Sequence, residues 1–352
     1  MPIGISFYTF QTLSYVIDIY NKRINPTKNI LAFFSFVAFF PQLVAGPIER
    51  AKNLLPQFFN RKKFDYNLVV GGLRLILWGL FKKTVIADNL GLIVDQIFDP
   101  ASNYSFLTII VGAIFFSFQI YCDFSGYSDI AIGVARTLGF KLTDNFKTPY
   151  FSKSFTEFWR RWHISLSTWF RDYVYIPLGG SKVKRARRNF NVFSTFLLSG
   201  LWHGANFTFL IWGAIHGMAL IIEKWLGNYK IYHTRVSPFV IFLIVSLFWL
   251  PFRAEDMQHL KSIVLQLIHF EFNFIELKTI FIGQFSLIKS YLFSIVFLSF
   301  ILLEKKIGLY DFNILVSGLK KSFRLGIYYL LIIIILFMSD FNIKPYFIYF
   351  QF

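Results

Sequence analysis

The chain has 352 residues, of which 55% are hydrophobic and 16% charged, and its formal net charge is +17. These proportions exclude an ordinary soluble domain, because apolar runs near the length needed to cross a hydrocarbon core of roughly 30 Å recur along the sequence. The positive charge does not indicate a nucleic-acid partner, since Lys and Arg gather in short loops between apolar runs. We therefore expect a polytopic integral membrane protein in a lipid bilayer.

The apolar segments predict an all-α fold class, because lipid offers no water to bind backbone groups and helices satisfy them internally. These segments are 4–20, 29–46, 68–94, 105–122, 124–140, 192–223, 237–252, 285–303 and 325–340. The alternation typical of barrel strands is absent, and no internal repeat of the kind found in many transporters stands out. A long polar region near 141–191 interrupts the membrane pattern.

Basic loops predict the topology. The loops 181–188 and 304–324 are rich in Lys and Arg and are expected on the cytoplasmic side, which places the C-terminal run “FIYFQF” outside. The segment 192–223 must then leave and return within 32 residues. Two short crossings or a re-entrant hairpin fit that length, and such backbone is tolerated where it is buried in protein or lines a wet cavity. This segment is therefore a candidate functional site.

His203 lies in the middle of that segment, between Trp202 and Gly204. A neutral imidazole can take a proton from a hydroxyl near pH 7 and return it, whereas the alternative is a histidine that hydrogen-bonds between helices. Asn206 is expected on the same helical side as His203, where it would orient the imidazole or bind an oxyanion. For His216, packing and catalysis are both open. The nearby glycines, which include Gly204, would let helices or a thin acyl chain approach closely.

Cations and aromatic residues gather in the polar region. Read as one helix, this stretch places Glu157, Arg160, Arg161 and His163 within two turns. One interpretation is an interfacial amphipathic helix that contacts lipid headgroups. The other is the cytosolic mouth of a site for an anionic, phosphate-bearing donor, because the planar guanidinium of Arg binds phosphate oxygens in pairs.

Polar residues also occur inside a nominal membrane span at 124–140. Intramembrane carboxylates are normally paired or functional, and we expect Asp129 to pair with Arg136 along one helical face. The single cysteine, Cys122, excludes an internal disulfide and is expected to be a packing residue. No metal site is expected, because no cluster of His and carboxylate residues has ligand spacing.

Several long motifs resemble the membrane-bound O-acyltransferases, in particular the alginate and peptidoglycan O-acetyltransferase type. They are “PIGISFYTFQTLSYVIDIY”, “FFPQLVAGPIER”, “YCDFSGYSDIAIGVARTLGF”, “NFKTPYFSKSFTEFWRRWHISLSTWFRDYVYIPLGG”, “SGLWHGANFTFLIWGAIHG” and “PYFIYFQF”. The resemblance implies a multi-helix bundle with re-entrant or short helices around a central tunnel, in the bacterial cytoplasmic membrane. It also implies a single transmembrane domain over 1–352 that lacks the usual N-terminal helices.

The same resemblance implies site residues and an activity. His203, in “WHG”, corresponds to the family's catalytic histidine, and His163, in “RRWHISLS”, to its second functional position. The residues expected to bind substrate are Arg160, Arg161, Trp162, Trp202 and Asn206. The implied reaction carries an acyl group, most simply acetyl, from a cytosolic thioester such as acetyl-CoA to a hydroxyl outside, with no bound cofactor.

The acceptor would be a cell-surface polysaccharide or a relay protein, such as an extracytoplasmic acetyltransferase or another polysaccharide-modifying partner. Two alternatives from other classes stay open at this point. One is a membrane transporter or channel, and the other is a non-catalytic scaffold of a polysaccharide export and modification complex. A transporter would show flux that does not depend on an acyl donor, whereas a scaffold would tolerate the loss of His203.

Overall fold

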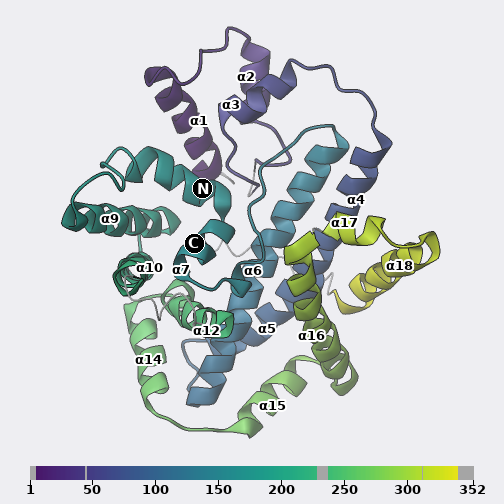
Figure 1. Cartoon of the computed structure of the whole chain (residues 1–352). Helices are drawn as coiled ribbons and strands as arrows, with labels where there is room; N and C mark the ends of the chain where they lie inside the picture. The colour runs from purple at the N-terminus through teal and green to yellow at the C-terminus, as the bar shows by residue number, and fades with distance from the viewer. Residues whose placement is uncertain (1–4, 44–45, 228–236, 311, 340–352) are drawn as a thin grey trace.

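The computed structural model describes residues 5–43, 46–227, 237–310 and 312–339 (Figure 1). It is 75% helical and contains no strand among those residues, which confirms the predicted all-α class. Within the described residues, four helices are long and apolar enough to cross a membrane. They are Phe106–Thr137, Phe207–Leu226, Leu287–Ile307 and Lys321–Met338.

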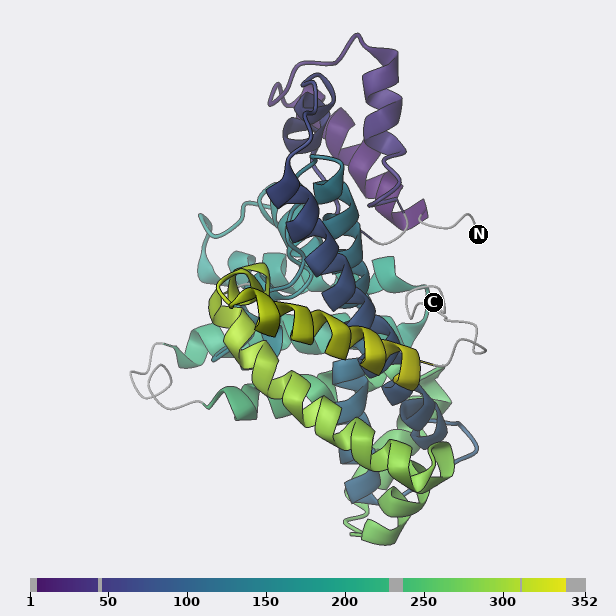
Figure 2. The ribbon, with the colours of Figure 1, turned by 90° about the vertical axis from the view of Figure 1, so that its right-hand side faces the viewer.

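The first part of the chain forms an N-terminal group of short helices and a central pair of long ones. The N-terminal group contains α1 (Ile5–Tyr20), α2 (Ile30–Val37), α3 (Ala51–Leu54) and the 3-10 turn η1 (Leu55–Phe58). The central pair consists of α6 (Phe106–Thr137) and a nearly continuous helix made of α4 (Tyr66–Leu80), the π-helical segment η2 (Phe81–Ala87) and α5 (Asp88–Ile97). Figure 2 shows the N-terminal group at one end of this pair.

Helix α6 is continuous where two apolar segments, 105–122 and 124–140, were expected. Its charged residues are accommodated because η2 supplies counter-charges: Lys83 Nζ lies 2.6 Å from Asp123 Oδ1, and Lys82 Nζ lies 2.7 Å from Asp129 Oδ2. The predicted pairing of Asp129 with Arg136 is therefore wrong. A residue seven positions along a helix is displaced by about 10 Å along the axis, whereas a lysine on the adjacent helix reaches the carboxylate directly.

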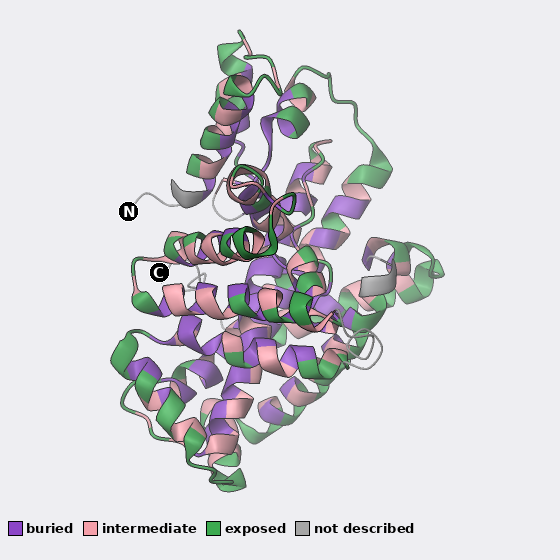
Figure 3. Ribbon diagram, turned by 60° about the vertical axis from the view of Figure 1, so that its left-hand side comes forward, coloured by how far each residue is buried: buried purple, intermediate pink, exposed green. Residues whose placement is uncertain are grey.

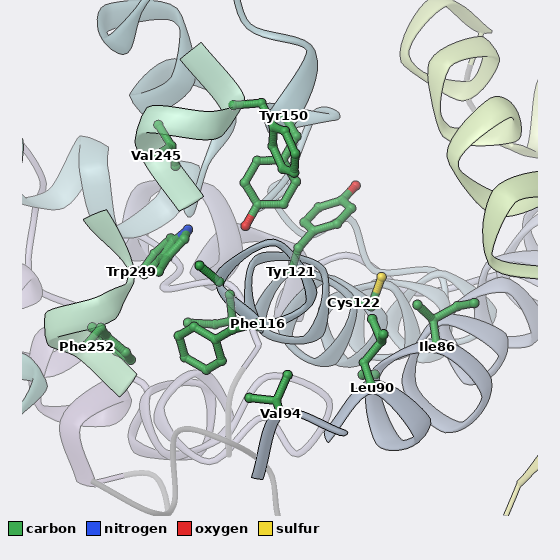
Figure 4. Packing of buried hydrophobic residues seen from close by; sticks show 14 of the residues in the cluster. Ile86, Leu90, Val94, Phe116, Tyr121, Cys122, Tyr150, Val245, Trp249 and Phe252 are labelled. Atoms are coloured by element: carbon green, nitrogen blue, oxygen red, sulfur yellow. The ribbon is translucent and has the colours of Figure 1, made fainter. Parts of the chain in front are cut away.

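The largest hydrophobic cluster surrounds the middle of α6. Figure 4 shows α6 end-on, with Trp249 and Phe252 on one side and Ile86 and Leu90 on the other. All four of these side chains are buried. Cys122 is also fully buried in this cluster, as expected of a packing residue. The helix thus carries side chains in every direction, as a helix buried in the centre of a bundle must.

The polar region folds into short helices rather than extended loops. They are the 3-10 turn η3 (Pro149–Phe151), α7 (Phe155–Arg161), α8 (Ile164–Phe170) and the π-helical turn η4 (Arg171–Tyr175). Two longer helices follow, α9 (Arg185–His203) and α10 (Phe207–Leu226), joined by residues 204–206. This pair contains the segment 192–223, for which two short crossings or a re-entrant hairpin were expected.

The last part of the chain packs against the central pair and leaves apolar side chains exposed. It contains α12 (Pro238–Phe248), α13 (Leu250–Arg253), α14 (Met257–Ile268), α15 (Phe274–Gln284), α16 (Leu287–Tyr310), α17 (Phe312–Ser317) and α18 (Lys321–Met338). Leu298 on α16 and Ile333 on α18 are among the exposed residues, as lipid-facing positions require. In Figure 2 both helices lie on the side that faces the viewer. The run “PYFIYFQF” lies outside the described residues.

Candidate active site

His163 lies at a sharp break between α7 and α8. Helix α7 ends at Arg161, Trp162 is extended, and His163 adopts the left-handed conformation with φ of 41°. The expected single helix through Glu157 and His163 is therefore wrong. A non-glycine residue in this conformation costs on the order of 1–3 kcal/mol and persists where its surroundings hold it. The break turns the histidine inward, and His163 is only 1% exposed.

Hydrogen bonds from three segments hold this break. The backbone N–H of Ile164 donates to the carbonyl oxygen of Asn145 (2.9 Å). The backbone N–H and the hydroxyl of Ser165 both donate to Asn145 Oδ1, at 3.2 and 2.6 Å. Ser165 Oγ in turn accepts from the backbone N–H of Ile48 at 3.0 Å. His163 is thus mounted on a backbone that is fixed to the loop before η3 and to the segment before α3.

Aromatic rings surround the His163 imidazole. The Phe124 ring of α6 meets it edge-on, with centroids 4.5 Å apart and an interplanar angle of 82°. Phe146 lies nearly parallel to it at 6.4 Å, and Trp202 lies 6.3 Å away. Because Trp202 immediately precedes His203, this contact brings the two predicted histidines into one region.

His203 is the last residue of α9, and Gly204 follows it in an extended conformation. Its imidazole contacts three aromatic rings, with centroid distances of 4.7 Å to Trp202, 5.0 Å to Trp212 and 5.1 Å to Phe252. Trp202 is therefore a common neighbour of His163 and His203. His163 lies at the break before α8 and His203 at the end of α9, so only the tertiary fold places the two side chains together.

Glycines allow α9 and α10, which lie side by side in Figure 3, to pack backbone against backbone. A Cβ atom at Gly200 would overlap the carbonyl oxygen of Phe209, and one at Gly213 would overlap the carbonyl oxygen of Phe196. The expected close approach at these glycines is thus made by the partner helix. This contact fixes the position of His203 at the end of α9 relative to the aromatic residues of α10.

A cavity of about 1240 Å³ lies between α7, α8, η4, α9 and α10. Its cationic lining comprises Lys153, Arg160, Arg171 and Lys224. Along α9 the lining reaches Ser199, one helical turn before His203, which is not itself part of the lining. The hollow region therefore coincides with the polar segment from which the sequence predicted a donor site.

The predicted substrate-binding residues separate into different environments. Arg160 lines the cavity, whereas Arg161 pairs with Glu157 (Nη2 to Oε1, 2.6 Å). Trp162 is 2% exposed and packs in the core, with its ring centroid 4.9 Å from that of Trp249. The Trp202 ring lies beside both His163 and His203. Of the five residues, Arg160 alone lines the cavity, because the chain turns inward directly after it.

Asn206 does not share a helical face with His203, because α9 ends at His203 and Asn206 caps the start of α10. Its Oδ1 accepts from the backbone N–H of Thr208 (3.1 Å), and its Nδ2 donates to the carbonyl oxygen of Glu255 (2.6 Å). Both the oxygen and the nitrogen of the Asn206 amide therefore make hydrogen bonds to the backbone. A glycine followed by Asn before an apolar run is a helix stop and an N-cap, which is the sequence signal for this break.

Glu223 is a site residue that the sequence reasoning did not single out. It lies in α10, is 8% exposed and lines the cavity, yet its carboxylate points at the start of α7. Glu223 Oε2 accepts from the backbone N–H of Phe155 at 2.5 Å. A carboxylate in an otherwise apolar helix is costly unless it has a partner, and this cost was the available signal.

His216 of α10 is fully buried in a cage of aromatic rings. Trp159, Trp212 and Phe248 surround it, with centroid distances of 5.1, 5.1 and 5.2 Å. Neither of its ring nitrogens has a hydrogen-bond partner among the described residues. Its surroundings fit the packing interpretation. Trp159, which contacts His216, lines the cavity, whereas His216 itself does not.

Comparison with known proteins identifies the class. A family model described as the membrane-bound O-acyltransferase family matches residues 21–252, which contain both histidines and the cavity lining. The chain belongs to the membrane-bound O-acyltransferase family. This assignment, together with the apolar helices, confirms the predicted multi-pass membrane location.

Individual relatives are similar over about three quarters of the chain or less. A Pseudomonas syringae protein named “Probable alginate O-acetylase AlgI” is 48% identical over 262 residues, which cover 73% of this chain and 50% of that protein. The peptidoglycan O-acetyltransferase of Helicobacter pylori is 38% identical over 289 residues, or 73% of this chain and 55% of its own. The teichoic acid D-alanyltransferase of Bacillus subtilis is 29% identical over 241 residues, or 65% and 61%. The chain spans about half the length of the first two relatives.

Proposed function

We propose that this chain transfers an acyl group, most simply acetyl, from a cytosolic thioester to a hydroxyl on the outer side of the membrane. The observation that carries the proposal is the convergence of His163 and His203 on Trp202, beside a cation-lined cavity. The names of two relatives specify O-acetylation of alginate or peptidoglycan. The acceptor is accordingly an envelope polysaccharide, or a partner protein that relays the group to one.

The chemistry assigned to His203 is general acid–base catalysis. The acceptor hydroxyl oxygen attacks the carbonyl carbon of the thioester, a C–O bond forms, and the C–S bond breaks. The His203 imidazole takes the hydroxyl proton during attack and returns it to the leaving thiolate sulfur. The rings of Trp202, Trp212 and Phe252 cover part of the His203 imidazole, which stays half-buried, and so reduce the water that reaches it.

The cavity between α7 and α10 suits the donor. A volume of about 1240 Å³ accommodates an extended small molecule, and its cations attract a phosphate-bearing one. Arg160 and Arg171 enter it from two different elements, α7 and η4. Ser199, which lines the cavity, lies on the same helix as His203 and one turn before it, so an acyl group at this part of the cavity would be near the histidine.

The test compares His203→Ala with His269→Ala, a matched loss of an exposed histidine outside the site. Both variants are expressed in cells, their amounts in the membrane are equalised by immunoblot, and envelope O-acetyl esters are measured by mass spectrometry. We expect His203→Ala to lower the transfer rate by about 10²- to 10⁴-fold, the usual contribution of a positioned acid–base group, and His269→Ala to leave it unchanged. Ester levels in His203→Ala equal to the parent would contradict the proposal and favour the scaffold alternative.

A further inference from the structure

A second cavity, of about 460 Å³, adjoins the first. Thr168 and Arg171 line both cavities, so the two hollows border the same stretch of chain, where α8 passes into η4. The charged lining of the second cavity comes from the end of α1 and its following turn, from the start of α3 and from η4. These side chains are Asp18, Arg23, Arg50, Lys52, Arg171 and Asp172.

Arg50 is the buried cation of this cavity. It is only 8% exposed, and its guanidinium stacks over the Tyr173 ring at 4.5 Å. Its Nη2 makes one long contact of 3.4 Å with Asp172 Oδ2, and its Nη1 has no hydrogen-bond partner among the described residues. A guanidinium offers five N–H donors, and a buried cation is costly unless anions or acceptors satisfy it. Burial accordingly lowers the pKa of Arg50 from its ordinary value.

The two carboxylates of the cavity are already engaged. Asp18 pairs with Arg23 (3.3 Å) and accepts from the Tyr173 hydroxyl (2.8 Å). Burial raises the pKa of Tyr173 to about 12, so this hydroxyl stays protonated and continues to donate. Asp172 is shared between Arg171 at 2.8 Å and Arg50 at 3.4 Å. Four cations thus face two shared carboxylates, which leaves the cavity with a positive excess.

We propose that this second cavity binds the phosphate end of the thioester donor, with Arg50 as the main phosphate ligand and Lys52 at its rim. The inference rests on the proposed function and adds a second anchoring point to it. Thioester carriers of the coenzyme A type bear their phosphates at the end remote from the sulfur. Binding of that end beside Arg50 would direct the thioester arm past Arg171 into the larger cavity, toward Ser199 and His203.

Phosphate is the favoured ligand class for two reasons. The planar guanidinium fork matches pairs of phosphate oxygens, and charge-assisted hydrogen bonds of this kind are about twice as strong as neutral ones. The cavity volume of about 460 Å³ falls within the usual range for small-molecule sites. An anionic lipid headgroup carries the same chemistry, and the experiment below separates the two sources.

The probe is adenosine 3′,5′-bisphosphate, which carries phosphates and no acyl arm, and its affinity for the purified full chain in phosphatidylcholine nanodiscs is measured by calorimetry. The variants are Arg50→Gln and Lys52→Gln. Lys63→Gln is the matched control, because Lys63 is an exposed cation between η1 and α4 that lines neither cavity. We expect Arg50→Gln to raise the Kd by about 10- to 100-fold, Lys52→Gln by roughly threefold or more, and Lys63→Gln to leave it unchanged.

Lys52→Gln keeps the test decisive if Arg50→Gln fails to fold, because Lys52 is exposed. Parent-like affinity in both variants would overturn the phosphate site. Displacement of the probe by phosphatidylglycerol in the nanodisc, with Arg50-dependent retention of that lipid, would assign the site to a headgroup and overturn the donor assignment. A third outcome is that His203→Ala loses acyl transfer while Arg50→Gln keeps both parent-like affinity for the probe and parent-like transfer. That outcome would overturn the phosphate site and leave the proposed function intact. If the probe binds in an Arg50-dependent way but the parent transfers no acyl group, the phosphate site would stand and the proposed function would be overturned.

Discussion

Glu223 in α10 accepts hydrogen bonds from both the backbone N–H (3.1 Å) and the hydroxyl (2.5 Å) of Thr156 in the first turn of α7. The first N–H groups of a helix have no partner within the helix, and the carboxylate supplies one. It also adds a negative charge at the positive end of a short helix. Arg160 lies on the same short helix, so Glu223 caps the helix that carries this cation to the cavity.

Replacement of Glu223 by Gln removes the charge and one pair of acceptor sites while keeping the shape. We expect the N-terminus of α7 to open more often, because each unsatisfied buried donor costs about 1–3 kcal/mol. Hydrogen exchange followed by mass spectrometry would report faster exchange at Phe155 and Thr156. Glu255→Gln, at an exposed position, is the control and should leave their exchange unchanged. Unaltered protection in Glu223→Gln would mean that α7 is held by other contacts.

His163→Ala is expected to reduce acyl transfer by roughly 100-fold, the size of effect that a misplaced reacting group produces. The companion variant is His163→Asn, because Asn tolerates the left-handed backbone that His163 adopts at φ of 41°. His163→Asn should therefore match the parent in thermal stability while still losing activity. His163→Gln, which keeps hydrogen bonding, distinguishes a positioning role from proton transfer, since recovery of most of the rate indicates positioning. Parent-like transfer in His163→Ala would remove this residue from the site.

Gly200→Ala should destabilise the α9 and α10 hairpin. The added Cβ would meet the carbonyl oxygen of Phe209, and overpacking of this kind typically costs about 1–3 kcal/mol. Gly326→Ala on α18 is the matched control, because a Cβ there meets nothing within 4 Å. We expect a lower melting temperature for the first variant and a parent-like or slightly higher one for the second. Equal melting temperatures would show that the two helices can separate without cost.

Asp129→Ala should destabilise the protein by roughly 3 kcal/mol, because it leaves the buried Lys82 ammonium without its carboxylate. Replacing both partners, as in Lys82→Met with Asp129→Leu, removes the uncompensated charge and should recover most of that loss. Thermal denaturation of the purified variants in detergent checks both expectations. A double variant no more stable than Asp129→Ala would show that this pair is not the source of the effect.

Composition and short-range pattern determined the class of this protein. Apolar runs of membrane-spanning length dictate helices, because the backbone must satisfy its own hydrogen bonds in lipid. The basic run 181–188 and the length of the apolar segment 192–223 predicted two short crossings or a re-entrant hairpin, and this segment forms the two helices α9 and α10. The motifs around His163 and His203 were also sufficient to indicate the family that the comparisons established.

Tertiary structure alone decided which residues meet. Asp129 pairs with Lys82 of η2 and not with Arg136, seven residues along its own helix. A side chain reaches a neighbouring helix more easily than it spans two turns of its own. His163 adopts a strained left-handed backbone because Asn145 and Ile48, from two separate segments, hydrogen-bond to the residues that directly follow it. Trp202 contacts both His163 and His203, and Glu223 caps α7, which is distant in sequence. Both contacts depend on how whole helices pack. A local pattern carries no information about such pairings, because their energies arise only when distant segments meet.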